Sequence, residues 1–217
     1  MRLPDNHAYL LSDGRLEQPG GIAKIDCEFL KKVHMLRAEY DAVLVGAGTL
    51  AADNPLLTVR YAEGRSPVRI VLDGKLSSPV NSRMFRDGEG RVILFHALKH
   101  SARLGKKLSA LQKSGVETHW LRGDREGHIN VTTLLKAIAR LGIASVLVEG
   151  GSKVFSEFIK RGAADKLELF TAPVILGEGK GFAEGILLES LSRAITLERL
   201  EVTPSGVDQL LTGYFKQ

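Results

Sequence analysis

VLVEGGSKVFSEF, which runs from Val146 to Phe158, joins two sequence patterns at a pair of glycines. The residues before the glycines form an apolar, β-branched run that is typical of a strand covered on both faces. The residues after them follow the spacing of an amphipathic helix. A strand that leads directly into a helix is the repeating unit of an α/β sheet. This stretch therefore predicts a strand-to-helix turn, with Glu149 as the last residue of the strand.

Other parts of the chain repeat this alternation of apolar runs and amphipathic stretches. Strands are expected at residues 41–48, 68–74, 91–96, 116–121 and 144–151, and helices at 24–39, 102–114, 131–141 and 153–161. Further along, three more strand patterns with little helix between them occur at residues 166–176, 194–204 and 208–217. We therefore predict an α/β fold with a mostly parallel central sheet, helices on both faces and antiparallel C-terminal strands. No repeat or linker divides the chain, so residues 1–217 are expected to form a single domain.

The composition excludes several classes of protein. Of the 217 residues, 44% are hydrophobic and 25% are charged, as in ordinary soluble proteins. No segment resembles a membrane span or a signal peptide, and the single cysteine, Cys27, fits a cytoplasmic protein. The net charge of +5 comes from scattered basic residues, which disfavours nucleic-acid binding but suits a small anionic ligand. The six histidines lack metal-ligand spacing, so no metal site is expected.

A second strand end with glycines lies in LRAEYDAVLVGAGTLAADNPLLTVR, residues 36–60. Gly46, Gly48 and Thr49 follow an apolar run, and glycines at the end of a parallel strand let a ligand approach the backbone closely. The spacing is neither the dinucleotide-binding fingerprint nor a phosphate loop. A tight turn without a ligand is therefore an equally good interpretation.

Charged residues flank this loop. Asp53 precedes Asn54 and Pro55, and its carboxylate could either cap the turn or face a ligand. Arg37 and Arg60 lie on either side of the loop in the sequence, and a guanidinium group matches the geometry of a phosphate. Surface ion pairs are the alternative role for both arginines.

Glu149 and the glycines after it could also bind a ligand. The backbone N–H groups of residues 150–153 would lie at the N-terminus of the next helix, where the helix dipole favours an anion such as a pyrophosphate. Glu149 would point into the same crevice as Thr49 and Asp53 if the two strands are neighbours. Helix capping or a pair with a lysine is the alternative role for Glu149.

With these residues in view, the chain resembles the reductase domain of riboflavin biosynthesis, a family with a dihydrofolate-reductase-like fold. The motifs that carry the resemblance occur in the family's order and cover most of residues 36–182: LRAEYDAVLVGAGTLAADNPLLTVR, PVRIVLDGKL, VLVEGGSKVFSEF and ADKLELFTAPVILGEGKGF. The resemblance implies an NADPH-dependent enzyme that reduces the ribosylamino group of a pyrimidine ribosyl 5′-phosphate to the ribitylamino form. Together with the strand-rich C-terminal part, it also implies a homodimer.

The resemblance assigns roles to residues of this chain. The expected substrate contacts, with the arginines near the phosphate, are Arg37, Leu57, Arg60 and Glu149. The expected NADPH contacts are Thr49, Asp53, Gly74, Gly150, Gly151, Ser152, Lys153 and Val154. Asp53 and Glu149 are the candidates for proton transfer during catalysis, and a water molecule is the alternative.

The N-terminal segment departs from the family pattern. Leu11 stands where the family has a serine, and residues 17–26 lack the serine and the aromatic residue that the family has there. Three alternatives therefore stay open: a reductase of another pteridine or pyrimidine, a non-catalytic nucleotide-binding protein, and a nucleic-acid-binding module. The sequence does not distinguish an amino from a deaminated pyrimidine substrate.

Overall fold

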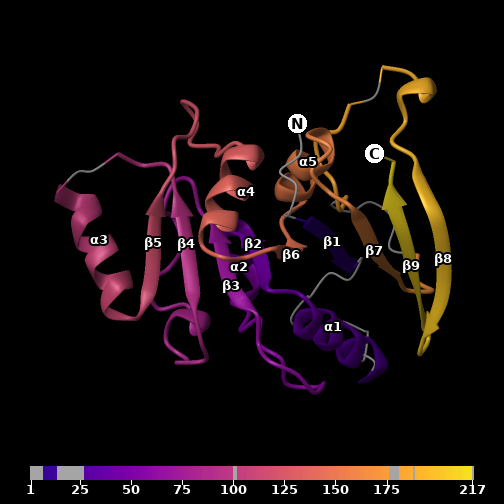
Figure 1. Cartoon of the computed structure of the whole chain (residues 1–217), viewed down its shortest axis with the longest axis horizontal. Coiled ribbons are helices and arrows are strands. Elements are labelled where there is room, and N and C mark those ends of the chain that lie inside the picture. The colour runs from indigo at the N-terminus through magenta and orange to yellow at the C-terminus, as the bar shows by residue number, and fades with distance from the viewer. Residues whose placement is uncertain (1–6, 14–26, 100–101, 176–180, 188, 217) are drawn as a thin grey trace.

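The computed structural model describes residues 7–13, 27–99, 102–175, 181–187 and 189–216. Nine strands form one sheet and are numbered along the chain (Figure 1). They are β1 (His7–Asp13), β2 (Ala42–Gly46), β3 (Val68–Leu72), β4 (Val92–His96), β5 (Val116–Trp120), β6 (Ser145–Gly150), β7 (Lys166–Thr171), β8 (Leu197–Ser205) and β9 (Asp208–Phe215).

The order of the strands across the sheet is β5-β4-β3-β2-β6-β1-β7-β9-β8. Every pair from β5 to β7 in this order is parallel. By contrast, β9 pairs antiparallel with both β7 and β8. This arrangement confirms the predicted sheet, which is parallel over most of its width and antiparallel at its C-terminal end.

Helices cover both faces of the sheet, as predicted. They are α1 (Cys27–Glu39), α2 (Ala47–Asp53), α3 (Ala102–Lys113), α4 (Val131–Arg140) and α5 (Ser152–Lys160), with single 3₁₀ turns at Arg83–Phe85 and Leu191–Arg193. Leu134 of α4 and Phe158 of α5 share a buried cluster with Val148. Leu36 of α1 clusters instead with Leu147, whose side chain points to the opposite face because successive strand residues alternate.

Local sequence explains where α4 begins and ends. The side chain of Asn130 accepts a hydrogen bond from the backbone N–H of Thr133 at 3.2 Å, which satisfies one of the unpaired donors in the first turn. Just beyond the helix, Gly142 has a φ of +79°, a left-handed conformation that glycine adopts without strain. Asparagine is a favoured N-cap residue and glycine is favoured just past a helix end, so the local sequence agrees with both boundaries.

The structure corrects the predicted bounds of several strands, two of which show why, and adds a strand that was not predicted. The strand predicted at 41–48 ends at Gly46, because Ala47 begins the helix that buries Leu50 against the sheet. The strand predicted at 166–176 ends at Thr171, shortly before Pro173, which has no N–H for strand pairing. The additional strand, β1, lies between β6 and β7 in the middle of the sheet.

Candidate active site

The carboxyl ends of β2 and β6 lie side by side. From the sequence, Glu149 was expected to point into the same crevice as Thr49 and Asp53 if these two strands were neighbours. The two strands are parallel, and their register sets Val45 opposite Gly150. Each strand runs directly into a helix, α2 after β2 and α5 after β6. In parallel sheets this edge is where ligands bind. The two strand-to-helix turns therefore belong to one candidate site.

Glycines allow these two turns to touch. A Cβ atom on Gly150 would lie 2.7 Å from Cγ2 and 2.8 Å from Oγ1 of Thr49, closer than side chains approach one another. A Cβ atom on Gly46 would lie 3.0 Å from Cγ2 of Val154. Gly151 has a φ of +99°, which other residues rarely adopt. We call these residues the glycine turns: Gly46, Thr49, Gly150, Gly151 and Val154.

The N-terminus of α5 continues the glycine turns and suits a phosphate group. Gly151 is the N-cap, and no side chain makes a cap hydrogen bond there. The first N–H groups of a helix have no partner within the helix, and the helix dipole favours negative charge at this end. Ser152 and Lys153 begin the helix, and Lys153 is exposed. These residues fit the phosphates of a dinucleotide cofactor.

Glu149 forms a bidentate ion pair with Arg37 of α1. The Nε and Nη2 atoms of Arg37 donate to Oε1 and Oε2 of Glu149, each at 2.7 Å, and the two side chains are 11% and 8% exposed. The register of β2 and β6 shifts here, so Glu149 has no partner on β2 and forms a bulge. Since its partner is an arginine and Gly151 caps α5, neither a lysine pair nor a helix cap explains Glu149.

Thr58 links Arg37 to Arg60. The Nη1 atom of Arg37 donates to the carbonyl oxygen of Thr58 at 3.2 Å, and Nη1 of Arg60 donates to the Thr58 hydroxyl at 3.0 Å. Thr58 is buried, whereas Arg60 is exposed. The two arginines that the sequence assigned to the substrate therefore converge on one buried residue.

His34 of α1 contacts the same segment at the backbone of Arg60. Its ring is 1% exposed, and Nδ1 accepts a hydrogen bond from the backbone N–H of Arg60 at 2.8 Å. Burial, reinforced by the positive charges of Arg37 and Arg60, lowers the pKa of His34 to about 4. A ring nitrogen that accepts a hydrogen bond carries no proton, in agreement with this neutral state. We call these residues the arginine cluster: His34, Arg37, Thr58, Arg60 and Glu149.

Asp53 is the last residue of α2 and is exposed. Partial burial of its carboxyl group nevertheless raises the pKa of Asp53 above its ordinary value. The helix is closed by Asn54, which adopts a left-handed conformation and donates its N–H to the carbonyl oxygen of Leu50 at 3.1 Å. The cap is therefore Asn54, and capping does not explain Asp53.

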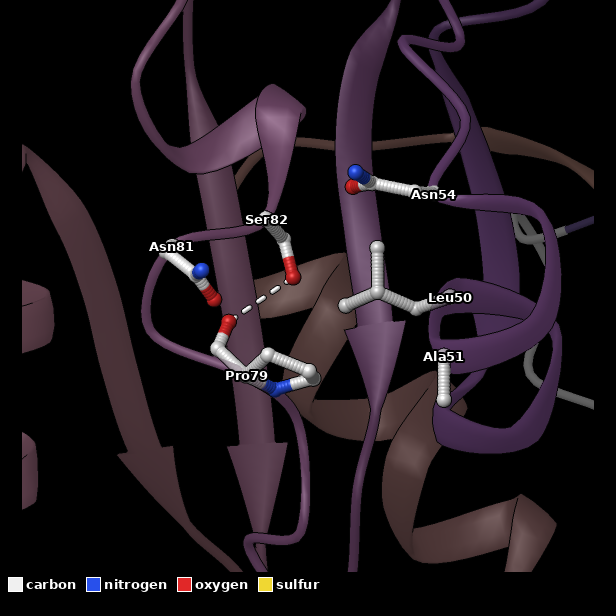
Figure 2. Close-up of a pocket in the computed structure, with 6 residues that line it drawn as sticks. All are labelled: Leu50, Ala51, Asn54, Pro79, Asn81 and Ser82. Atoms are coloured by element: carbon white, nitrogen blue, oxygen red, sulfur yellow. Dashed lines mark hydrogen bonds between the residues drawn. The ribbon is translucent and has the colours of Figure 1, made fainter.

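A small pocket lies beside α2 (Figure 2). Its volume is about 120 Å³, and it is lined by Leu50, Ala51, Asn54, Pro79, Asn81 and Ser82. The Ser82 hydroxyl on its rim is already paired, because it donates to the carbonyl oxygen of Pro79 at 2.7 Å. Small-molecule sites usually occupy about 300 Å³ or more. This pocket is too small for a nucleotide and is not the predicted substrate site.

Two predicted contact residues can touch a ligand only in limited ways. Leu57 has a φ of +58° and is 3% exposed, with its side chain in the core, so only its backbone could reach a substrate. Gly74 is half-buried, and its side-chain direction is blocked, because a Cβ atom there would lie 1.8 Å from the carbonyl oxygen of Gly127. The carboxylate of the adjacent Asp73 accepts hydrogen bonds from the N–H groups of Ser77 and Ser78 and so holds its own turn.

The sequence interpretation missed His34 and Thr58. A buried histidine on an amphipathic helix has the pattern of a core residue, and Thr58 lies in an irregular segment. One signal was present: His34 is three residues before Arg37, so the two side chains share a helix face. The hydrogen bond to Arg60 joins residues 26 positions apart and leaves no trace in local spacing.

The remaining predictions concern the N-terminal segment, metal ions and membrane spans. Leu11 lies in β1, but its side chain and residues 14–26, where the sequence departs from the family pattern, fall outside the described part of the chain. Among the described residues, no three His, Cys, Asp or Glu side chains are grouped so that they could hold a metal ion. None of the described helices is long and apolar enough to cross a membrane.

The fold and this edge define an α/β protein with a candidate ligand site where two parallel strands end. The chain belongs to the RibD C-terminal domain family, whose model matches residues 11–211. This match confirms the resemblance stated from the sequence motifs.

Similar proteins carry consistent names. The riboflavin biosynthesis protein RibD of Bacillus amyloliquefaciens is 34% identical over 88% of this chain and 49% of its own length. A 2,5-diamino-6-ribosylamino-4(3H)-pyrimidinone 5′-phosphate reductase of Methanothermobacter thermautotrophicus is 30% identical over 94% of both chains. A Thermotoga maritima deaminase/5-amino-6-(5-phosphoribosylamino)uracil reductase structure has a TM-score of 0.75 at 33% identity, covering 98% of this chain and 57% of that one. The chain thus spans about half the length of the RibD relatives it matches.

Proposed function

We propose that this chain is an NADPH-dependent reductase of riboflavin biosynthesis that converts the ribosylamino group of a pyrimidine ribosyl 5′-phosphate to the ribitylamino form. The observation that carries the proposal is the contiguity of two groups of residues. Glu149, the end of the arginine cluster, is followed directly by Gly150 of the glycine turns. A phosphorylated substrate and a dinucleotide could therefore meet at a single strand end. The names of the relatives agree with this activity.

The cofactor would lie along the glycine turns and the first turn of α5. The contact between Thr49 and Gly150 leaves no room for a side chain, so backbone groups would face the phosphates. Gly151, Ser152, Lys153 and Val154 would supply the helix end. When bound, NADPH supplies the hydride, and the protein's share is binding and orientation.

On the substrate side, Arg60 and Glu149 would have different tasks. No carboxylate of the described residues forms an ion pair with Arg60, so its guanidinium group is suited to the substrate phosphate. Both oxygens of Glu149 accept hydrogen bonds from Arg37, which orients the carboxyl group as an acceptor. Glu149 would thus accept hydrogen bonds from the substrate, and Arg37 would hold it in place.

The reduction also requires a proton. A hydride adds to C1 of the ring-opened ribose imine, and a proton adds to the imine nitrogen, which gives the ribitylamine. Asp53 suits the role of donor because its raised pKa keeps a larger fraction of the carboxyl protonated, and water is the alternative source.

Turnover tests the proposal. NADPH oxidation would be followed by absorbance with the amino and with the deaminated pyrimidine ribosyl phosphate, and the ribityl product would be identified by mass spectrometry. We expect oxidation with one of the two substrates and an equal amount of product. NADPH binding without oxidation of either mixture would contradict the proposal and favour a non-catalytic nucleotide-binding protein.

We also propose that residues 1–217 act as one reductase domain in the cytoplasm and associate as a homodimer. The edge of the sheet supports association, because β8 is its last strand and Leu200 and Val202 there are 57% and 58% exposed. Apolar side chains on an uncovered edge strand favour pairing with another chain. Light scattering that gives the mass of a single chain at micromolar concentration would contradict the dimer.

A further inference from the structure

His34 has a more specific place in the molecule than a core residue needs. Its ring lies on α1, three residues before Arg37, and its Nδ1 atom accepts the backbone N–H of Arg60 at 2.8 Å. The ring is almost fully buried and packs edge-on against Tyr61, with ring centroids 4.9 Å apart at 89°. One imidazole thus contacts both the backbone N–H of Arg60 and the side chain of Tyr61.

The side chain of Arg60 is fixed at a second point. Its Nη1 atom donates to the hydroxyl of Thr58 at 3.0 Å, and its guanidinium carbon lies 5.8 Å from the centroid of the Tyr61 ring. Arg60 is itself exposed, so without these contacts it would sample many rotamers. A guanidinium held at its backbone and at its tip can bind a phosphate without first losing that freedom.

We propose that His34 is a positioning residue for the substrate phosphate, acting through the backbone of Arg60. The inference rests on the proposed function, because it assigns Arg60 to the phosphate. The imidazole does not touch the substrate; it supplies an acceptor at Nδ1 that keeps the segment of residues 58–61 in one conformation. A neutral ring is required, since a proton on Nδ1 would remove the acceptor and set a third positive charge beside Arg37 and Arg60.

The test compares two replacements at position 34. His34→Asn places its side-chain oxygen the same number of bonds from the backbone as Nδ1, whereas His34→Leu has no acceptor. We expect His34→Leu to raise KM for the phosphorylated substrate on the order of tenfold with kcat nearly unchanged, and His34→Asn to restore most of the loss. KM for NADPH should stay the same in both variants. The dephosphorylated riboside should bind the wild type and His34→Leu equally weakly.

A control separates positioning from general loosening of α1. Val33→Ala removes a buried core side chain next to His34 and should lower stability without raising KM. Equal KM changes in Val33→Ala and His34→Leu, or no rescue by His34→Asn, would overturn the proposal. If the wild type oxidises no NADPH, the proposed function fails separately. In that case, calorimetry with ribose 5-phosphate tests the role of His34. Tighter binding by the wild type than by His34→Leu would support the role, and equal binding would overturn it.

Discussion

The glycine turns and the arginine cluster lie at the same edge of the sheet but are built in opposite ways. The glycine turns depend on the absence of side chains, which lets Thr49 come against Gly150. The arginine cluster depends on side chains from distant segments, since Arg37 and Glu149 are 112 residues apart in the chain. Backbone shape thus forms one half of the candidate site, the glycine turns, and paired charges form the other half, the arginine cluster. An added side chain should therefore damage the glycine turns, and the loss of a charged group should damage the arginine cluster.

The largest effect is expected from breaking the Arg37–Glu149 pair. Arg37→Ala would leave a largely buried carboxylate without its guanidinium partner and should lower the free energy of unfolding by about 4 kcal/mol. Arg65→Ala is a matched control, because the Arg65–Asp41 pair is exposed at 73% and 33% and should lose less than about 1 kcal/mol. Urea unfolding measures both. Equal losses would show that the cluster is not held by this buried pair.

Acid should weaken the arginine cluster through His34. Its pKa is about 4 in the folded protein and 6.5 in the unfolded chain, so folding favours the neutral ring. The contribution to stability is complete above pH 6.5 and is lost as pH falls towards 4, by about 3 kcal/mol. Burial is the largest cause of this loss, and the positive charges of Arg37 and Arg60 account for the rest.

The matched variant for this pH effect is His34→Asn, which cannot take up the proton. The difference in unfolding free energy between wild type and variant, measured by urea at several pH values, should change by that amount between pH 6.5 and 4. A difference that stays constant would show that His34 does not become charged in this range.

The glycine turns should be sensitive to a single methyl group. Gly150→Ala would place a Cβ atom 2.7 Å from Thr49, so we expect a loss of about 2 kcal/mol in stability and a higher KM for NADPH. Thr49→Ala should relieve part of the stability loss in the double variant. Gly48→Ala is the control for stability, because nothing lies within 4 Å of its Cβ position and alanine favours a helix. If both alanines are tolerated equally, close packing does not shape this turn.

The smallest effect is expected for the exposed end of the arginine cluster. Arg60→Ala keeps the backbone N–H that His34 holds and removes the side chain beyond Cβ, including the guanidinium group. We expect KM for the phosphorylated substrate to rise about tenfold while KM for NADPH and stability stay nearly the same. Arg60→Lys should recover part of the affinity, because it restores the charge but not the planar fork. Equal losses for both ligands would argue against a phosphate role.

The two regions also differ in how far the sequence predicted them. The glycine turns follow apolar strand runs directly, so their position could be inferred from a few adjacent residues, and the pairing of β2 with β6 confirmed their proximity. The resemblance pointed to Arg37, Arg60 and Glu149, but nothing local indicates that Arg37 and Glu149 pair with one another. Such a contact depends on where α1 packs, which is a property of the whole fold.

Strand β1 is a part of the fold that the local sequence likewise does not predict. Its sequence, HAYLLSD, contains no β-branched residue, and it is expected to be a strand only once β6 and β7 are known to flank it. Strands β2, β3 and β4 have largely apolar runs and were predicted within a few residues. Tertiary pairing, rather than intrinsic preference, makes β1 a strand.

The bulge at Glu149 also sets the spacing between Val148 and the glycines that follow β6. Because Glu149 has no partner on β2, it adds one residue of length to β6 between Val148 and Gly150. Substitution there changes a functional group and leaves the chain length intact. Deletion would instead draw the glycines back by about 3.3 Å and turn the following residue to the other face. In engineered or recombined versions of this protein, a substitution at 149 would cost the pair with Arg37, whereas a deletion there would also change the spacing between Val148 and Gly150.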